Sequence, residues 1–450
     1  MATTAGTPFS EVLSRLPLRN FQILTFVICM LVLVCDGIDA QLLGIVAPKV
    51  IADFGVDRGT FGIAMSAALV GFGLGSWGGG WLGDKIGRRY SLAIAALIFS
   101  LATIAASQAD GVWHMAAWRI LGGLGFGSAY ANAIALASEW LPDRWRSVAV
   151  TTLSVGTPAG GFIVAALAPS LVLNHGWRGS FVVFGAATLL VVLLILALLR
   201  DSPSYLLAKG RPEAAQKAAQ KVLDAQVALA PERHETNAAT GAAVGVLDRS
   251  NLRLNIGVGV SFAAAAMVAY SILSWTTTML TAKNFTFEQA SYAVSVGGIT
   301  SVLASIAAGL LVRWLGSRAV MGGVTVSLLA TLVVLAYTIE TMPVMPDASE
   351  RLMVVVLIGL AAALFSAAIA SLYAIMTYAY PPSCRSAGIG FGIFMGRVGA
   401  VSATFFGGTL LDMGRGSVLP FFGVLIVSSV FIAATSVVMD RQIPPARKAV

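Results

Sequence analysis

Four ionisable residues stand inside long apolar stretches of this 450-residue chain: Asp36, Asp39, Arg119 and Arg397. Each costs ~2.5–3.5 kcal/mol at the centre of a membrane helix, so the four together oppose insertion by roughly 10 kcal/mol before any pairing. Two are acidic and two are basic, so they can neutralise one another. Ionisable residues in such surroundings usually face a protein interior or a water-filled cavity, where they mark the path of a proton or a solute.

Asp39 and Arg119 are at depths that allow them to meet. At ~1.5 Å per helical residue, Asp39 lies about 12 Å and Arg119 about 9 Å from the outer ends of their stretches, and Asp36 lies almost one turn deeper than Asp39. One interpretation is that these three residues couple a proton to the function, because a carboxylate that changes its surroundings can gain and lose a proton. The alternative is that Asp39 and Arg119 form a structural pair that locks two helices together.

Arg397 lies about 16 Å from the inner end of its stretch, near the membrane midplane. No carboxylate stands at that depth in the second half of the sequence. An unpaired guanidinium can bind an anionic carboxylate through two parallel hydrogen bonds. We therefore interpret Arg397 as facing a substrate, with a structural role as the alternative.

These residues must be positioned by membrane-spanning helices. Hydrophobic residues make up 57% and charged residues 11% of the chain, against ~45–50% and ~25% in soluble proteins, so there are too few charges to coat soluble domains. The net charge of +8 therefore does not indicate nucleic-acid binding. Lys and Arg gather in the loops on one side, which predicts a multi-pass protein of a bacterial-type cytoplasmic (inner) membrane with both termini in the cytoplasm.

Twelve stretches of the sequence are apolar and of about the ~20-residue length that crosses a bilayer. They are residues 21–47, 59–82, 90–109, 113–140, 147–172, 179–200, 253–281, 287–312, 319–340, 351–377, 386–410 and 417–438. This pattern predicts an all-α polytopic membrane protein with twelve transmembrane helices in two six-helix pseudo-repeats. The expected domains are an N-terminal bundle at 1–200, a cytoplasmic linker at 201–252 with a surface helix at 211–227, and a C-terminal bundle at 253–450.

Similar loop sequences support the repeat. Gly80 and Gly87 follow the second stretch with the same spacing as Gly309 and Gly316 after the eighth. Two similar halves joined by an inside loop are typical of a transporter whose halves rock about a site near the bilayer midplane.

The run Gly80–Trp81–Leu82–Gly83–Asp84–Lys85–Ile86–Gly87–Arg88–Arg89 resembles the loop motif of the major facilitator superfamily. The run from Arg119 to Gly127 is similar to that superfamily's fourth-helix motif, and Asp201–Ser202–Pro203 resembles the sequence that follows helix six in its sugar and organic-acid porters. The resemblance implies the two-bundle fold and a transporter rather than an enzyme.

A narrower resemblance, to the aromatic acid:proton symporter family, comes from Asp36–Gly37–Ile38–Asp39, Tyr380–Pro381 and Gly396–Arg397–Val398–Gly399. It implies proton-coupled import of a benzoate-like acid, such as a hydroxybenzoate or protocatechuate, by alternating access, with Asp36 and Asp39 implicated in transport. For such a substrate we expect one cation, Arg397, and several ring-contacting or hydrogen-bonding groups. The candidates are Gln41, Tyr270, Trp275 and Tyr373. The alternative for the aromatic residues is a place in the interfacial belts.

The loop motif also predicts a gate on the cytoplasmic side. Asp84 can bind the exposed amides at the start of a neighbouring helix, or an arginine such as Arg146, in one state only. We expect Glu139 to join this gate through Arg144 or Arg146. The full gating set is Gly80, Asp84, Gly87, Arg88, Arg89, Glu139, Arg146, Arg313 and Arg385. Because Arg313 stands where the first motif has Asp84, the second motif cannot copy the first; the alternative for Arg88 and Arg89 is that they only set topology.

Other functions are weighed against this one. Another organic-anion or sugar-acid porter, or an efflux pump, would share the fold, but a sugar porter should offer more Asn and Gln in its central helices. A metal-dependent membrane enzyme is disfavoured because His114, His175 and His234 fall at span ends or in loops. An ATP-driven pump is disfavoured because the sequence has no phosphate-binding Gly-x-x-x-x-Gly-Lys-Ser/Thr run. We expect no cofactor, no metal and no nucleic-acid partner, and a monomer in the lipid bilayer.

Overall fold

The structure is a computed structural model of the chain. It describes residues 7–14, 16–142, 144–145, 149, 152–153, 155–223, 229–230, 246, 248–380 and 384–445, without the side chains of Trp77, Arg385 and Ser386.

Long apolar helices make up most of the described chain. Eleven of them are long and apolar enough to cross a membrane. They are α2 (Asn20–Phe54), α3 (Arg58–Ile86), α4 (Arg88–Ala106), α5 (Val112–Trp140), α7 (Gly156–Leu198), α10 (Leu252–Ala282), α11 (Phe287–Leu315), α12 (Ser317–Glu340), α13 (Ala348–Ala379), α14 (Arg385–Met413) and α15 (Leu419–Val438). The 43 residues of α7 would be about 65 Å long as one helix, roughly twice the thickness of a bilayer core.

Gly176 divides α7 into two membrane crossings. Its backbone leaves the helical region, with φ 67° and ψ 177°, a conformation that glycine adopts at little cost. The fifth and sixth predicted spans are therefore present as two arms of α7. The prediction of an all-α protein with twelve transmembrane helices is confirmed.

Short elements surround the first bundle at one end. They are α1 (Phe9–Ser14), α8 (Pro203–Ala208), α9 (Pro212–Ala219) and two strands, β1 (Thr7–Pro8) and β2 (Leu229–Ala230), which pair in parallel. A 3₁₀ turn, η1 (Arg249–Asn251), precedes α10. α9 ends at Ala219, before the end of the surface helix predicted at 211–227, of which residues 224–227 lie outside the described part of the chain. The strand pair is not evident in the sequence. The boundaries predicted for the three domains stay a prediction.

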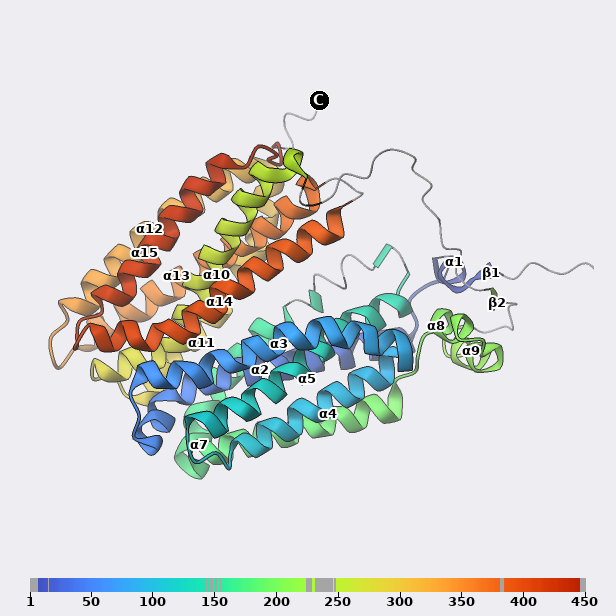
Figure 1. The fold of residues 1–450 in the computed structure, drawn as a ribbon, viewed down its shortest axis with the longest axis horizontal. Helices are drawn as coiled ribbons and strands as arrows, with labels where there is room; N and C mark the ends of the chain where they lie inside the picture. The colour runs from blue at the N-terminus through green and yellow to red at the C-terminus, as the bar shows by residue number, and fades with distance from the viewer. Residues whose placement is uncertain are drawn as a thin grey trace, which may run out of the picture.

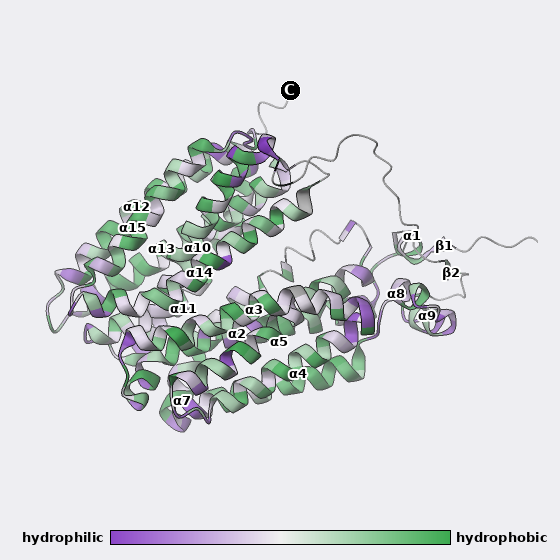
Figure 2. Ribbon diagram, in the orientation of Figure 1, coloured by the Kyte–Doolittle hydropathy of each residue, from purple (hydrophilic) through white to green (hydrophobic). Residues whose placement is uncertain are grey.

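The helices form two bundles, α2 to α7 and α10 to α15, which diverge towards α8 and α9 (Figure 1). We call the end that carries α8 and α9 the linker end and the other the opposite end. Hydrophobic residues run along the helices and hydrophilic residues gather near their ends (Figure 2), as expected of a protein whose solvent is lipid.

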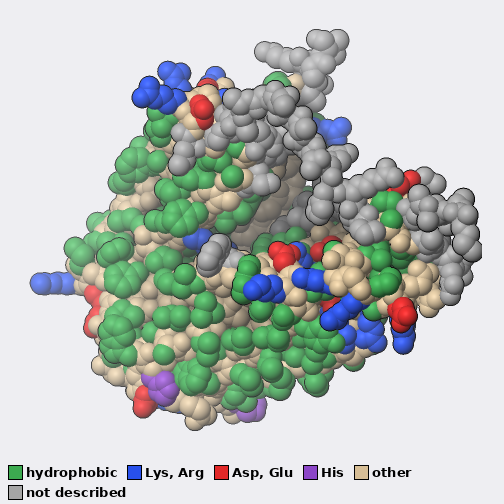
Figure 3. Space-filling model, turned by 45° about the vertical axis from the view of Figure 1, so that its right-hand side comes forward, with side chains coloured by type: hydrophobic (Ala, Val, Ile, Leu, Met, Phe, Trp, Pro, Cys, Tyr) green, Lys and Arg blue, Asp and Glu red, His purple; other side chains and the backbone are tan. Residues whose placement is uncertain are grey.

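The two bundles share a large hydrophobic core at the opposite end, and a small cluster of Leu69, Ala266 and Ala400 also joins them near the middle of their helices. That core joins residues such as Leu43 and Phe61 of the first bundle to Trp275 and Leu280 of the second. The cores at the linker end are separate, one in each bundle. The surface is hollowed between the bundles on the linker-end side (Figure 3). The molecule is thus closed at the opposite end and open at the linker end.

Each bundle closes on itself in a similar way at the linker end. Gly87, before α4, and Gly316, before α12, both have positive φ, at 103° and 81°. A Cβ on Gly87 would lie 2.7 Å from a carboxylate oxygen of Asp201, just after α7. A Cβ on Gly316 would lie 2.9 Å from the carbonyl oxygen of Ile443, just after α15. In both bundles, therefore, the segment after the sixth crossing packs on the start of the third.

Candidate functional site

Asp39 and Arg119 form a buried ion pair inside the first bundle. The Arg119 guanidinium donates from Nη1 to Asp39 Oδ2 at 2.8 Å and from Nη2 to the Asp39 carbonyl at 3.1 Å. Thr103 Oγ1 donates to the other carboxylate oxygen at 2.7 Å. Asp39 is 3% and Arg119 4% exposed. This geometry ties α2 to α4 and α5, which favours the structural interpretation of the pair; its predicted part in proton coupling stays a prediction.

Asp36 has quite different partners, although it lies one helical turn from Asp39. Thr157 of α7 donates from Oγ1 to Asp36 Oδ2 at 2.9 Å. The second oxygen, Oδ1, is buried and has no hydrogen-bond partner among the described residues. A Cβ on Gly37 would collide with the backbone of Thr157, and one on Gly160 would collide with the backbone of Val34. The absence of side chains at these two glycines is what lets α2 and α7 bring Asp36 and Thr157 together.

Arg397 of α14 reaches across from the second bundle to the first. Its Nη1 donates to the Tyr270 hydroxyl at 3.2 Å, and its guanidinium carbon lies 3.8 Å from the centroid of the Phe72 ring. The guanidinium forms no ion pair with a carboxylate in the described part of the chain. It is close enough to Asp36 to interact with it electrostatically. Arg397 therefore has a cation–π contact and a neutral hydrogen-bond partner, but no charged partner of its own.

Aromatic side chains from both bundles surround this arginine. Tyr130 of α5 lies near Asp36 and Arg397, and its ring centroid lies 6.0 Å from that of Phe72. Tyr373 of α13 is 41% exposed and packs edge-to-face on Phe262. Phe72 and Tyr130 were not among the predicted site residues. The spacing of Tyr130 from Arg119, three helical turns along one face, was the signal that could have included it.

Two predicted substrate residues stand apart from the others. Gln41 is half-buried and faces Gly161 of α7, whose added Cβ would lie 3.0 Å from the Gln41 side chain. Trp275 is fully buried at the opposite end, where it packs on Gly407 and Gly408 and its indole nitrogen has no hydrogen-bond partner. In this conformation Trp275 belongs to the shared core rather than to the surroundings of Arg397. Their roles in substrate binding stay predictions.

The predicted gating residues of the first bundle form one network at the linker end. Arg88 pairs with Asp84 of its own bundle, donates from Nη1 to the Gly80 carbonyl at 3.2 Å, and lies 3.3 Å from Glu139 Oε1. Ser202 Oγ donates to the second Glu139 oxygen at 2.7 Å. Among the described residues Glu139 thus pairs with Arg88, whereas Arg144 donates to the carbonyls of Ser14 and Leu16.

Asp201 holds the start of α4. Its Oδ1 accepts a hydrogen bond from the backbone amide of Arg89 at 2.9 Å, as a carboxylate at a helix N-terminus should. Burial raises the pKa of Asp201, and this bond to the Arg89 amide partly offsets the increase. The Tyr205 hydroxyl donates to the Lys85 carbonyl at 3.0 Å. These contacts fasten the segment after helix six to the loop motif.

The remaining predicted gating residues are less informative. Arg146 lies outside the described residues, and only the backbone of Arg385 is described, as the first residue of α14. Arg313 is exposed near the end of α11.

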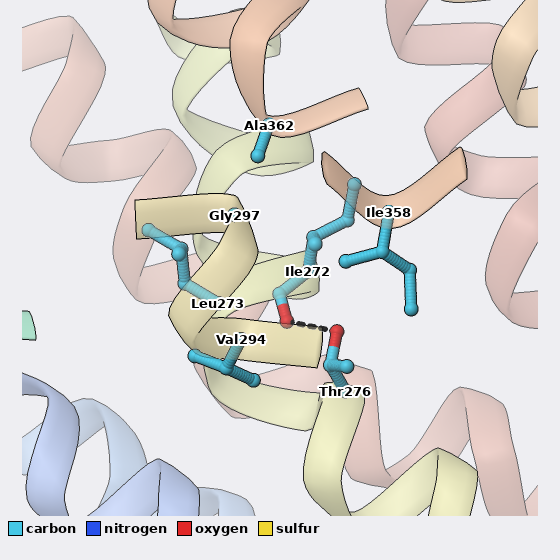
Figure 4. A pocket seen from close by; sticks show the side chains of 7 residues that line it. All are labelled: Ile272, Leu273, Thr276, Val294, Gly297, Ile358 and Ala362. Atoms are coloured by element: carbon cyan, nitrogen blue, oxygen red, sulfur yellow. Dashed lines mark hydrogen bonds between the residues drawn. The ribbon is translucent and has the colours of Figure 1, made fainter. Parts of the chain in front are cut away.

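A small apolar pocket lies elsewhere, between α10, α11 and α13 (Figure 4), and Ile272, Val294 and Ile358 are among its lining residues. It has no ionisable side chain in its lining and does not include Arg397.

A family model described as the Major Facilitator Superfamily matches residues 29–404. The chain belongs to the Major Facilitator Superfamily. Like other members it is a membrane transporter, and the site described above lies between the two bundles of this Major Facilitator protein.

Curated relatives match this Major Facilitator protein along most of its length. The 4-hydroxybenzoate transporter PcaK of Pseudomonas aeruginosa is 29% identical, with 88% of each chain covered. The gallate transporter of Pseudomonas putida is 28% identical, covering 94% of this chain and 93% of the relative. The 3-(3-hydroxy-phenyl)propionate transporter of Escherichia coli is 28% identical, covering 93% and 94%.

Solved Major Facilitator structures share the fold. A crystal structure of a D-xylose-proton symporter superposes with a TM-score of 0.70 at 15% identity, covering 95% of this chain and 99% of that one. A bacterial homologue of the human lysosomal transporter Spinster, in an inward-facing and unoccupied conformation, gives the same TM-score at 15% identity, covering 94% and 97%.

Proposed function

We propose that this protein imports a small aromatic carboxylate together with protons by alternating access. The observation that carries the proposal is the arrangement at the interface of the bundles, where Arg397 contacts Phe72 and Tyr270 and forms no ion pair with a residue that the structure describes. The names of three relatives, which transport 4-hydroxybenzoate, gallate and a hydroxyphenylpropionate, support the same class of substrate.

The substrate carboxylate binds Arg397 in this proposal. A planar guanidinium pairs with a carboxylate through two charge-assisted hydrogen bonds, which are about twice as strong as neutral ones. Phe72, Tyr130 and Tyr373 lie near Arg397 and offer aromatic rings against which an aromatic acid can pack. The hydroxyls of Tyr130 and Tyr270 can pair with a ring hydroxyl or with the carboxylate itself.

Asp36 carries the transported proton in this proposal. Its Oδ1 has no donor among the residues that the structure describes, which supports a role for that oxygen in holding a proton. An isolated charge costs more to bury than a neutral polar group, so a proton on Asp36 lowers the cost of its buried position. Because Asp36 also interacts with Arg397, its negative charge competes with a substrate anion for the same guanidinium. Proton binding to Asp36 therefore favours anion binding at Arg397.

The linker end faces the cytoplasm in this proposal, and the protein acts as a monomer in the inner membrane. The clustering of basic residues in the loops at that end supports this orientation. The open end of the described conformation is then the cytoplasmic one, from which substrate would be released.

Proteoliposomes test the proposal. With labelled 4-hydroxybenzoate and an acidic exterior, the wild type should accumulate substrate above equilibrium. Arg397→Gln should weaken substrate binding roughly 10- to 100-fold, the equivalent of one lost charge-assisted interaction. Asp36→Asn should still bind substrate and lose the accumulation driven by the pH gradient. Arg318→Gln, which removes an exposed arginine at the linker end, is the matched control and should behave as the wild type.

Three outcomes would overturn parts of this proposal. Accumulation that survives in Asp36→Asn and Asp39→Asn alike would remove the proposed proton site. Full affinity in Arg397→Gln, or a preference for a sugar acid over benzoate-like acids, would assign the transporter to another class of porter. Net movement of substrate out of vesicles against its gradient would identify an efflux pump.

A further inference from the structure

The first membrane helix, α2, and the first arm of α7 pack so closely that their backbones touch. A Cβ on Gly37 of α2 would collide with the Thr157 carbonyl, and one on Gly160 of α7 would collide with the Val34 carbonyl. Both contacts are with backbone, so no rotation of a side chain could relieve them. This crossing therefore fixes the start of α7 against the turn of α2 that carries Asp36.

Several buried threonines of the membrane helices donate their hydroxyl proton within their own helix. Thr188, Thr276 and Thr325 each donate to the carbonyl four residues earlier, at 3.1, 2.6 and 2.6 Å. Thr157 is the second residue of α7, so no carbonyl of that helix lies four residues before it. Its hydroxyl donates instead to Asp36 Oδ2 on the neighbouring helix, at 2.9 Å. The position of Thr157 in α7 therefore leaves its single hydroxyl proton for the carboxylate.

Thr157 is the hydrogen-bond partner of Asp36 among several ionisable neighbours. The side chains that lie near Asp36 and can carry a charge are Cys35 and Asp39 of α2, Tyr130 of α5 and Arg397 of α14. The ionisable residues of α7, His175 and Arg178, lie at its Gly176 break, about 27 Å along the helix from Thr157. Among the described residues, Thr157 alone is hydrogen-bonded to the Asp36 carboxylate. The protonation of that carboxylate therefore depends on one hydroxyl of α7 as well as on these charges.

A hydroxyl donor distinguishes the two protonation states of a carboxyl group. A hydrogen bond to an ionised acceptor is roughly twice as strong as one to a neutral acceptor, so donation to a carboxylate favours its charged form. While Thr157 donates to Oδ2 of Asp36, a proton can bind to Oδ1 and leave from it. The bond from Thr157 therefore assists the release of the proton and does not have to break when the proton binds.

We propose that Thr157 is a positioning residue for proton transport, which holds one oxygen of Asp36 and thereby sets the pH range in which the other oxygen releases its proton. This role rests on the proposed function, in which Asp36 carries the transported proton, and extends it to a residue of α7. It does not depend on which aromatic acid the protein carries.

Infrared difference spectra of the full chain in nanodiscs test this role without a substrate. The carbonyl band of a protonated carboxyl group, assigned to Asp36 by its loss in Asp36→Asn, gives the midpoint of the titration of that residue. Thr157→Val keeps the shape of the side chain and removes the donor. It should move the midpoint by about one pH unit towards higher pH, because a hydrogen bond that favours the charged form is lost. Thr157→Ser keeps the donor and should titrate as the wild type does.

Transport in proteoliposomes separates this role from a purely structural one. Exchange of internal for external labelled 4-hydroxybenzoate needs no net release of protons, whereas accumulation driven by a pH gradient does. Thr157→Val should therefore keep the exchange rate of the wild type and lower the initial rate of accumulation about ten-fold, the equivalent of one pH unit in proton release. Thr325→Val, which removes a buried hydroxyl that donates within α12, is the matched control and should leave both rates unchanged. Thr157→Ala serves if Thr157→Val does not fold.

Titration midpoints in Thr157→Val and Thr157→Ala that equal that of the wild type would overturn the role of Thr157 and leave Asp36 as the proton carrier. A midpoint in Thr157→Ser that moves as far as in Thr157→Val would also overturn it, because the hydroxyl would not be the cause. A wild-type spectrum in which no band depends on Asp36 would instead remove the proposed proton site, and the role of Thr157 with it. A shifted midpoint without any uptake of aromatic acids would support the role of Thr157 and reject only the proposed substrate.

Discussion

Two aspartates on one helix have opposite surroundings in this protein. Asp39 has partners for both carboxylate oxygens, from Arg119 and Thr103. Among the described residues, Asp36 has a partner for one oxygen, from Thr157. The difference comes from the neighbouring helices, because α4 and α5 surround Asp39 whereas Asp36 faces α7 and the second bundle. Asp39 therefore holds helices together, whereas Asp36, one turn away, is left to take part in the proposed proton transport.

This contrast predicts different effects on stability. Asp39→Asn leaves Arg119 buried without a counter-charge, and breaking a buried pair in this way typically costs about 3–5 kcal/mol. Asp36→Asn removes a buried carboxylate with no ion-pair partner and should change the free energy of unfolding by less than ~1 kcal/mol. Melting temperatures in detergent, measured for both variants side by side, provide the check.

Double replacement supplies the control. Asp39→Asn with Arg119→Gln removes both charges and should recover part of the stability that Asp39→Asn loses. Equal melting temperatures for Asp36→Asn and Asp39→Asn would contradict the structural role assigned to the pair.

At the scale of the helices, most of the fold could be predicted from the sequence. Apolar length alone located the crossings, since lipid allows few other backbone structures. It did not show that the fifth and sixth crossings form one element with a break at Gly176, because a positive φ at one glycine leaves no mark in hydropathy. The buried charges indicated Arg397 and Asp36, but the rings around them, at 72 and 130, come from other helices. Whether these rings lie near Arg397 and Asp36 depends on how whole bundles pack, and that packing could not be predicted from the sequence.

Glycines decide how closely α3 and α5 can cross. A Cβ on Gly123 would collide with the Ala68 carbonyl and lie 2.9 Å from the Phe72 amide nitrogen. A Cβ on Gly122 would lie 3.6 Å from the Ala102 side chain, an ordinary contact. Gly123→Ala should therefore destabilise the protein by about 1–3 kcal/mol. Gly122→Ala should be neutral or stabilise by up to ~1 kcal/mol, because alanine favours helix more than glycine.

Thermal unfolding of these two neighbouring variants isolates the helix crossing from general effects of alanine. Because Gly123 packs beside Phe72, transport in Gly123→Ala should fall together with stability. A Gly123→Ala variant as stable as Gly122→Ala would mean that the crossing of α3 and α5 can widen without cost.

At the scale of the whole molecule, the two bundles are joined at the opposite end and separated at the linker end. The orientation that we propose for the molecule in the membrane rests on its basic loops and is open to direct test. Lys217, in α9, is exposed at the linker end, and Met345, between α12 and α13, is exposed at the opposite end. Each can be replaced by cysteine. In intact bacteria a membrane-impermeant maleimide should label Met345→Cys, and it should label Lys217→Cys after permeabilisation alone.

The wild type serves as the background control, since its three cysteines are buried. Labelling of Lys217→Cys in intact cells would invert the assigned orientation, and with it the direction in which the open end releases substrate.

Gly87 and Gly316 allow contacts within each bundle that affect where the molecule can change shape. In each bundle the segment after the sixth crossing is hydrogen-bonded to the start of the third crossing. The bond is made by Asp201 in the first bundle and by the Ile443 carbonyl in the second. A rocking motion of the bundles leaves both of these contacts intact, because neither of them joins one bundle to the other. In the proposed alternating movement, each bundle therefore turns as one unit, and the change in geometry falls at the interface between the bundles.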